Sequence, residues 1–305
     1  TSLRFSADNV FYGILVLLGI VGNLLVVVTI TVAGYEVGTI LASDFILANL
    51  AIVNFLISTI RNVPLFISDL GLKIYLSRDY CKIFMFLWVW LRSVSIWATF
   101  CISFFHFLVI RRHHFSVLRK GKELRNIIIT TSVIWIGNFF YAFPTCFYST
   151  RAYGNETDTI QLLSATTRPF LGCIWKFPSL YSGVAYATAS LVIHEVFPIF
   201  LMVVINLGTL YILYRHSRAV GVETLVTRVA SERRAAKVIL ILVTLFVICW
   251  VTNVLMVNYN HNTEKSIRVF VMLANFGASL FIGFSPVVLM VGHSKLRKKL
   301  MNFTL

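Results

Sequence analysis

The chain has 305 residues, of which 58% are hydrophobic and only 13% are charged. A water-soluble domain carries roughly 25% charged residues, because its surface needs groups that water can solvate. The net charge of +15 would suit a nucleic-acid-binding protein if the basic residues formed one face of a soluble fold. They fall instead between long apolar segments, which argues against nucleic acid as a partner and indicates a membrane protein.

Seven apolar segments follow one another along the chain. A segment of about 20 apolar residues spans a bilayer as a helix, the form that keeps backbone polar groups hydrogen-bonded in lipid. The segments are residues 10–32, 44–66, 84–110, 127–147, 181–214, 235–257 and 267–291. They predict an all-α membrane protein, with one seven-helix transmembrane domain over residues 1–305 and a short cytoplasmic helix after the seventh span. The long fifth segment is expected to project beyond the membrane.

The orientation follows from the basic residues, which are enriched in cytoplasmic loops. One side holds sixteen Lys and Arg with five acids, and the other holds nine with six. The first side is therefore predicted to be cytoplasmic and the amino terminus extracellular, although the first loop on the cytoplasmic side has no Lys or Arg. Asn155 then lies in an outer loop within a glycosylation sequence, whereas the Asn302 sequence lies in the cytoplasmic tail.

Two of the five cysteines, Cys81 and Cys173, lie in outer positions, where a disulfide can persist, and we expect them to pair. Cys101 and Cys249 lie within helices and are expected to be small apolar fillers. Cys146 is near an outer helix end, and its state stays open.

One set of signature positions per helix resembles the rhodopsin-like G-protein-coupled receptors. These positions are Gly22-Asn23, Asn49-Leu50-Ala51, Trp135, Pro198, Cys249-Trp250 and Pro286, together with the two outer cysteines. The departures from the common pattern are Asn54, Phe105-His106-Phe107, Thr252 and Ser285-Pro286-Val287-Val288-Leu289. They resemble the type-1 vomeronasal receptors and the fish class-A-related olfactory receptors. Matching stretches are RSVSIWATFCIS from Arg92, EVFPIFLMV from Glu195, LYRHSR from Leu213, SERRAAKVILILV from Ser231 and FSPVVLM from Phe284.

The resemblance implies a multi-pass plasma-membrane receptor that binds a small-molecule odorant or pheromone and activates a heterotrimeric G protein. It implies neither an enzyme nor a cofactor or metal, and the sequence has no phosphate-binding loop and no Cys/His cluster with metal-ligand spacing. A bitter-taste-like receptor is the alternative within the class. A transporter or channel is the alternative outside it, although no two related halves are visible.

Arg92 and Glu195 are ionisable residues deep inside predicted spans, where a charge needs a partner or a water-filled cavity. They either form a pair that locks the bundle or line the ligand pocket, and both roles are compatible. Helical spacing adds further candidates for the pocket. The full set of ligand-binding candidates is Trp88, Arg92, His194, Glu195, Asn253, Val257, Asn275 and Ser279. Arg61 in the second span either faces the bundle or extends toward the membrane surface.

Two further roles follow from the resemblance. Trp250 and Pro286 are expected to take part in activation, and the alternative for Trp250 is an ordinary packing role. On the cytoplasmic side, His106 replaces the usual arginine of the third helix, and the alternative for it is also packing. The expected G-protein contacts are His106, Arg111, Arg112 and His113.

Overall fold

The computed structural model describes residues 7–72, 74, 76–111, 120–151, 171–219, 237–252 and 268–292. Some of the predicted features lie outside these residues. They are Arg112, His113, Asn155, Asn253, Val257, Asn302 and the helix expected after the seventh span. Asn275 lies within the last described helix, but its side chain is not described.

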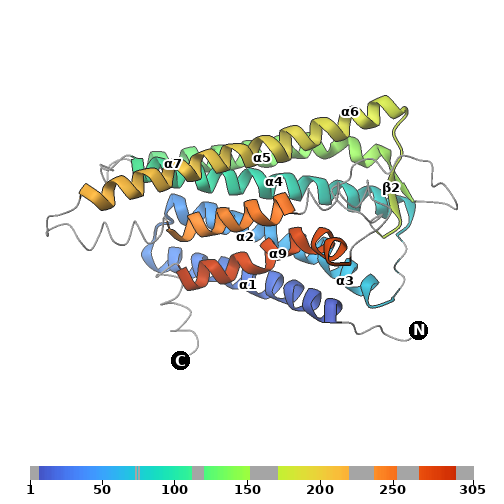
Figure 1. The fold of residues 1–305 in the computed structure, drawn as a ribbon, viewed down its shortest axis with the longest axis horizontal. Coiled ribbons are helices and arrows are strands. Elements are labelled where there is room, and N and C mark those ends of the chain that lie inside the picture. Colours follow the sequence, from blue (N-terminus) through green and yellow to red (C-terminus); the bar gives the residue numbers. More distant parts are fainter. Residues whose placement is uncertain are drawn as a thin grey trace.

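The described residues form a bundle of helices at the seven places that the apolar segments predict (Figure 1). The bounds are α1 (Ala7–Val37), α2 (Ala42–Ile57), η1 (Ser58–Asn62), α3 (Val63–Asp69), α4 (Arg78–Arg111), α5 (Lys120–Tyr148), α6 (Leu180–Leu191), η3 (Val192–Val196), α7 (Phe197–Ala219), Lys237–Thr252 and α9 (Arg268–Gly292). The second span runs continuously through α2, η1 and α3, and the fifth through α6, η3 and α7. Five of the spans are long and apolar enough to cross a membrane over their described residues.

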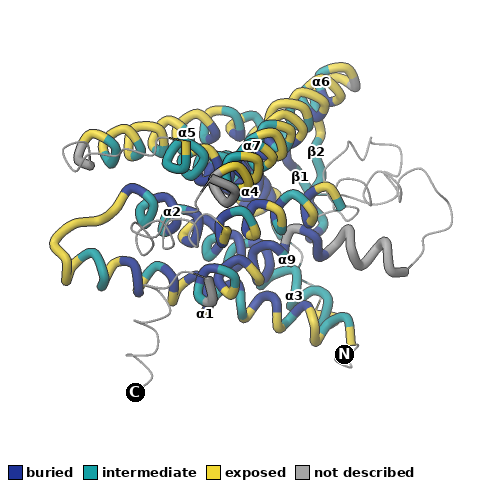
Figure 2. The backbone as a smooth tube through the Cα atoms, turned by 60° about the vertical axis from the view of Figure 1, so that its left-hand side comes forward, coloured by how far each residue is buried: buried dark blue, intermediate teal, exposed yellow. Residues whose placement is uncertain are grey.

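Large apolar side chains cover the outside of the bundle. Exposed positions follow the outer faces of α5, α6 and α7 (Figure 2), and examples are Phe140, Phe147 and Leu207. In water such a surface would drive aggregation, whereas lipid solvates it at no cost. Several residues that these helices bury are small or polar, among them Asn138, Ala142, Thr145 and Ala187, as expected where helices pack without a hydrophobic driving force between them.

The central helix of the bundle is α4, which packs against α2, α5 and α7, while α1 packs between α2 and α9. The contact between α1 and α9 is close at Gly22. A Cβ atom there would lie 2.7 Å from Cγ of Pro286, so the two signature positions pack directly on each other. Asn23 follows and donates from Nδ2 to the Ile282 carbonyl at 3.1 Å, which ties the same two helices together.

The second and fifth spans each contain one wide π-helical turn, η1 and η3. A proline follows each turn, Pro64 in α3 and Pro198 in α7. Proline has no N–H for the carbonyl four residues earlier, and its ring clashes with that carbonyl, so the turn before it opens. Arg61 and Glu195 each lie three residues before the proline and are buried inside the bundle. The two wide turns therefore bring two charged side chains inward.

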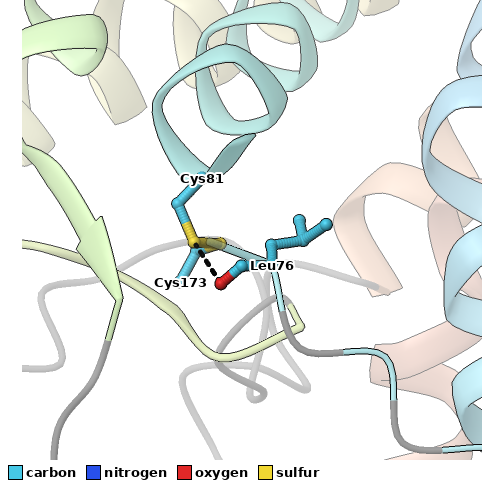
Figure 3. The surroundings of a disulfide bond; sticks show 3 residues. All are labelled: Leu76, Cys81 and Cys173. Atoms are coloured by element: carbon cyan, nitrogen blue, oxygen red, sulfur yellow. Dashed lines mark hydrogen bonds between the residues drawn. A yellow bond between two sulfur atoms is a disulfide. The ribbon is translucent and has the colours of Figure 1, made fainter. Parts of the chain in front are cut away.

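A short antiparallel hairpin, absent from the all-α expectation, covers one end of the bundle. It pairs β1 (Ser149–Arg151) with β2 (Cys173–Trp175), and β1 packs against α4. Cys173 in β2 and Cys81 in the first turn of α4 form the predicted disulfide (Figure 3). The Leu76 carbonyl oxygen lies 4.0 Å from the Cys81 sulfur. This is a contact without a donated hydrogen, because a disulfide sulfur carries none.

An odd number of spans places the start of the first span and the end of the last span at opposite ends of the bundle. The start of α1 lies at the same end of the bundle as β2, and α9 ends at the opposite end (Figure 1).

Cys101 and Cys146 are partly buried free cysteines, and Cys249 is a buried one. The remaining thiols therefore have no disulfide partner in the described structure, which answers the question that the sequence left open for Cys146.

Candidate functional site

An ion pair joins the third and fifth spans in the interior of the bundle. Arg92 of α4 donates from a terminal guanidinium nitrogen to Oε1 of Glu195 in η3 at 2.5 Å. Their side chains are only 12% and 8% exposed. A buried charge without a partner is strongly destabilising, so each residue stabilises the other where it lies. The pairing that the sequence left as one of two roles is present.

The Arg92 guanidinium lies close to two aromatic rings. Its Cζ atom lies 4.3 Å from the ring centre of Trp250 and 5.6 Å from that of Trp88. On Trp88 a second guanidinium, that of Arg61, lies 4.2 Å from the ring centre. Desolvated contacts of this kind contribute about 2 kcal/mol or more. A series of alternating cations and rings therefore crosses the bundle from η1 through α4 to the helix Lys237–Thr252.

Arg61 faces the bundle and does not extend toward the membrane surface, since it is only 2% exposed. It donates to Oδ1 of Asn62 at 2.8 Å and to the Ser279 hydroxyl at 3.4 Å. The Ser279 hydroxyl in turn donates to Asn62 Oδ1 at 3.2 Å. Ser279, predicted as a ligand contact, is thus engaged with Arg61 and Asn62, and this cluster connects η1 with α9.

His194 lies beside Glu195 but points in another direction. Its ring stacks on Tyr141 of α5 with a centroid distance of 3.6 Å, and Trp97 donates from its indole nitrogen to His194 Nδ1 at 3.3 Å. The Tyr141 hydroxyl is hydrogen-bonded to Ser190, and Tyr186 donates to the Tyr141 carbonyl at 3.2 Å. His194 therefore belongs to an aromatic cluster between α4, α5 and the fifth span.

A small cavity lies beside Arg92. Its described lining comes from α2, α4, Lys237–Thr252 and α9. The lining residues are Ile57, Trp88, Arg92, Ser95, Ile96, Phe246, Cys249, Trp250, Gly277, Phe281 and Ile282. The cavity is mostly apolar with a few polar groups, which is the usual make-up of a small-molecule site. Trp88, Arg92 and Trp250 are the predicted residues that it brings together, whereas His194, Glu195 and Ser279 are not in this lining.

A polar network lies next to the cavity and involves two of the departures from the common receptor pattern. Asn54 donates from Nδ2 to the Ser285 hydroxyl at 3.2 Å and accepts from the Ser95 hydroxyl at 3.3 Å. Since Ser95 lines the cavity, this network connects the cavity with α2 and α9. Ser285 precedes Pro286, so the network ends at the proline expected to take part in activation.

Of the predicted G-protein contacts, the structure describes His106 and Arg111, near the carboxyl-terminal end of α4. His106 lies five residues before the end of this helix, with its ring 5.6 Å from that of Phe105, and Arg111 is exposed in the last turn. The Ser103 hydroxyl donates to Asn206 at 3.2 Å, and the Phe107 ring packs on Gly208. The two helices α4 and α7 are therefore in direct contact on either side of His106 in the sequence of α4.

Several residues of the site were not among the predicted ligand-binding residues, although the sequence offered Arg61 as a residue that could face the bundle. Arg61, Asn62, Ser95 and Asn54 contribute to the polar interior, and Tyr141 holds His194. Arg61 and Glu195 each lie three positions before a proline. This shared spacing is the sequence signal that could have identified Arg61. In the described ranges no group of three His, Cys, Asp or Glu side chains has the geometry of a metal site.

The bundle, the disulfide and the signature contacts together define a seven-transmembrane receptor. Residues 22–286 match the family described as 7 transmembrane receptor (rhodopsin family), and the chain belongs to this family. It is therefore a multi-pass receptor of the plasma membrane and not an enzyme. A curated relative is Olfactory receptor class A-like protein 4 of Danio rerio, which is 42% identical over 310 aligned residues covering 97% of this chain and 89% of the relative. This match confirms the subfamily resemblance drawn from the sequence motifs.

Proposed function

We propose that this receptor is chemosensory: it binds a small-molecule odorant or pheromone in the cavity beside Arg92 and activates a heterotrimeric G protein. The observation that carries the proposal is the cavity itself, where the charged guanidinium of Arg92 meets an apolar lining from four spans. Such a site holds a small amphiphilic molecule by its polar group and buries the rest.

The lining suggests how binding is transmitted. Trp250 contacts Phe246 with a centroid distance of 6.1 Å, and Phe246 contacts Phe281 of α9 at 4.8 Å. A ligand that fits one arrangement of these rings better than another shifts the population toward that arrangement. A shift of Phe281 acts on α9 five residues before Pro286. This is the activation role proposed for Trp250 and Pro286.

On the cytoplasmic side we propose that the G protein contacts His106, Arg111, Arg112 and His113. A protonated imidazole donates hydrogen bonds from both ring nitrogens. His106 can therefore supply some of the hydrogen bonds to the G protein that the usual arginine would donate. The basic residues at and after the end of α4 add positive charge for an acidic partner surface.

The proposed orientation places the amino terminus, β1 and β2 outside the cell. The Cys81–Cys173 disulfide supports it, because disulfides persist in oxidising compartments and the hairpin lies at the end where α1 begins. Asn155 then lies on the glycosylated side. The excess of basic residues predicted for the opposite side agrees with this orientation.

The name of the curated relative favours an odorant over the bitter tastant of the alternative. The test is a screen of odorants and bitter tastants on cells that express the chain with a promiscuous G protein and a calcium reporter. We expect odorants to elicit responses that cells without the receptor do not show. A response confined to bitter tastants supports the alternative, and a current or uptake without any G-protein response contradicts the proposal.

A further inference from the structure

We infer that Arg61 is a positioning residue of the ligand site: it fixes the indole of Trp88 in the cavity wall and ties that wall to α9. The inference rests on the proposed function, because it concerns the regulation of the same cavity. Trp88 is among the described residues of the lining, and Arg61 is not. The Arg61 guanidinium lies 4.2 Å from the ring centre of Trp88, closer than that of Arg92 at 5.6 Å. Arg61 therefore acts on the cavity through Trp88.

Burial makes the contact between Arg61 and Trp88 strong. The two residues are 2% and 4% exposed, so water does not compete for the guanidinium. The face of an indole ring attracts a cation, and the attraction is largest where both groups are desolvated. Rotation of the ring about its side-chain bonds would break this contact, so the orientation that keeps the ring at the cation is favoured. Arg61 thereby selects one orientation of a bulky residue in the cavity wall.

Hydrogen bonds from η1 and α9 hold the Arg61 guanidinium in place. Arg61 donates to Oδ1 of Asn62 at 2.8 Å and to the Ser279 hydroxyl at 3.4 Å. Ser279 donates to the same Asn62 oxygen at 3.2 Å, so the three groups form one cluster. A guanidinium is planar and its N–H groups have fixed directions, so these acceptors set the tilt of its plane as well as its position. The Trp88 ring therefore lies against a cation whose orientation depends on Asn62 and Ser279.

The hydrogen bond to Ser279 connects Arg61 with a second wall of the cavity. Ser279 lies in α9 between Gly277 and Phe281, which both line the cavity. Arg61 thus contacts one wall at Trp88 and is hydrogen-bonded to the helix that forms the other. A ligand that displaces the α9 wall changes the hydrogen bonds of Arg61 and with them the preferred orientation of Trp88, and the coupling is reciprocal.

Two native cysteines allow a test that needs no known agonist. Cys249 lines the same cavity as Trp88, whereas Cys101 lies on α4 and is not in the described lining. The purified receptor is treated with methyl methanethiosulfonate, a small uncharged thiol reagent, and mass spectrometry follows the modification of each cysteine. In Arg61→Met the Trp88 ring is no longer held, and we expect Cys249 to react at least about tenfold faster, the scale of a desolvated cation–π contact. The rate at Cys101 should not change.

A double-mutant cycle assigns the effect to Trp88. In the Trp88→Leu background the ring is absent, so Arg61→Met should change the rate at Cys249 by less than about twofold. Ser279→Ala removes one of the groups that hold Arg61 and should accelerate the reaction at Cys249 by a smaller factor than Arg61→Met. This milder variant keeps the test decisive if Arg61→Met does not fold.

Thr59→Val is the matched control for these variants. Thr59 lies in the same turn η1 as Arg61, and its hydroxyl donates to the Phe55 and Leu56 carbonyls of its own span. The control should react with the reagent, and respond to odorants, as the unmodified receptor does.

Signalling gives the second readout. The odorant of highest potency in the screen described above is titrated on cells that carry equal amounts of each receptor variant at their surface. Arg61→Met should raise the half-maximal concentration severalfold, and this shift should vanish in the Trp88→Leu background. A merely structural role of Arg61 would lower the amount of receptor at the surface without this dependence on Trp88.

The outcomes separate this inference from the proposed function. The inference is overturned by an unchanged rate at Cys249, by an effect of Arg61→Met that persists in Trp88→Leu, or by an unchanged odorant potency. Acceleration of Cys101 together with Cys249 also overturns it, because the whole bundle is then loosened. If the thiol rates follow the expectation but no odorant elicits a response, the positioning of Trp88 by Arg61 stands and the proposed function is contradicted.

Discussion

Arg92 in α4 and Glu195 in η3 form an ion pair 2.5 Å apart that joins the third and fifth spans inside the bundle. Arg92 also lies over Trp250, a residue of the cavity wall. The same guanidinium is thus part of the interior packing and part of the proposed ligand site. The two roles that the sequence offered for the pair are therefore compatible in one geometry.

We expect the π-helical turn η3, which precedes Pro198, to direct the Glu195 side chain toward Arg92. Pro198→Ala restores an N–H that can donate to the His194 carbonyl, which allows a regular helix and turns Glu195 away. We expect a loss of stability of up to roughly 3–5 kcal/mol, the scale for breaking a buried pair. Thermal denaturation of the purified receptor measures it.

The control for this prediction is Pro144→Ala, because Pro144 lies within the regular helix α5. Its effect should be smaller and independent of Glu195. In a background that already carries Glu195→Gln, the change at Pro198 should add little. If Pro198→Ala is as destabilising there as in the unmodified chain, the turn does not act through Glu195.

The disulfide encloses a long loop, because Cys81 and Cys173 are 92 residues apart in sequence. Replacing either cysteine by serine should lower the free energy of unfolding by on the order of a few kcal/mol, because the unfolded chain regains the entropy that the crosslink removed. The double replacement should be no worse than either single one. Cys146→Ser, at a free cysteine, is the control and should change little. Detection of both Cys81 and Cys173 as free thiols by mass spectrometry of surface receptor would contradict this.

Glycosylation tests the proposed orientation. We expect a glycan on Asn155 and none on Asn302, because the transferase acts only on the side that becomes extracellular. Deglycosylation should increase the electrophoretic mobility of the receptor and of the Asn302→Gln variant, and should have no effect on Asn155→Gln. A glycan attached to Asn302 would reverse the orientation.

His106→Ala should reduce G-protein activation at equal surface expression, since the imidazole supplies hydrogen bonds that alanine cannot. The matched control is Phe104→Ala, because Phe104 lies on the same helix and is exposed on the apolar surface. It should signal normally. Equal signalling by His106→Ala and the unmodified receptor would assign His106 to packing alone.

The helices and the disulfide were predictable from the sequence, because apolar length and topology are local or additive properties. The ion pair was predictable for a similar reason: Arg92 and Glu195 are charged in segments where lipid penalises an unpaired charge. The direction of each side chain was not. A π-helical turn adds a residue to the helical repeat, so regular spacing could not place Arg61, and it did not separate His194 from Glu195. Likewise Ser279 keeps helical spacing with Asn275, yet its hydroxyl is engaged by Asn62 and Arg61.

The most direct test of the account is a double-mutant cycle on the ion pair with an agonist as the second readout. Arg92→Met and Glu195→Gln should each lower stability by roughly 3–5 kcal/mol, and the double variant should lose less than the two single losses together, because neither charge is left unpaired. Agonist potency should change in both variants that lack Arg92. Strictly additive losses of stability, with agonist potency unchanged in all three variants, would contradict both the coupling and the place of Arg92 in the ligand site.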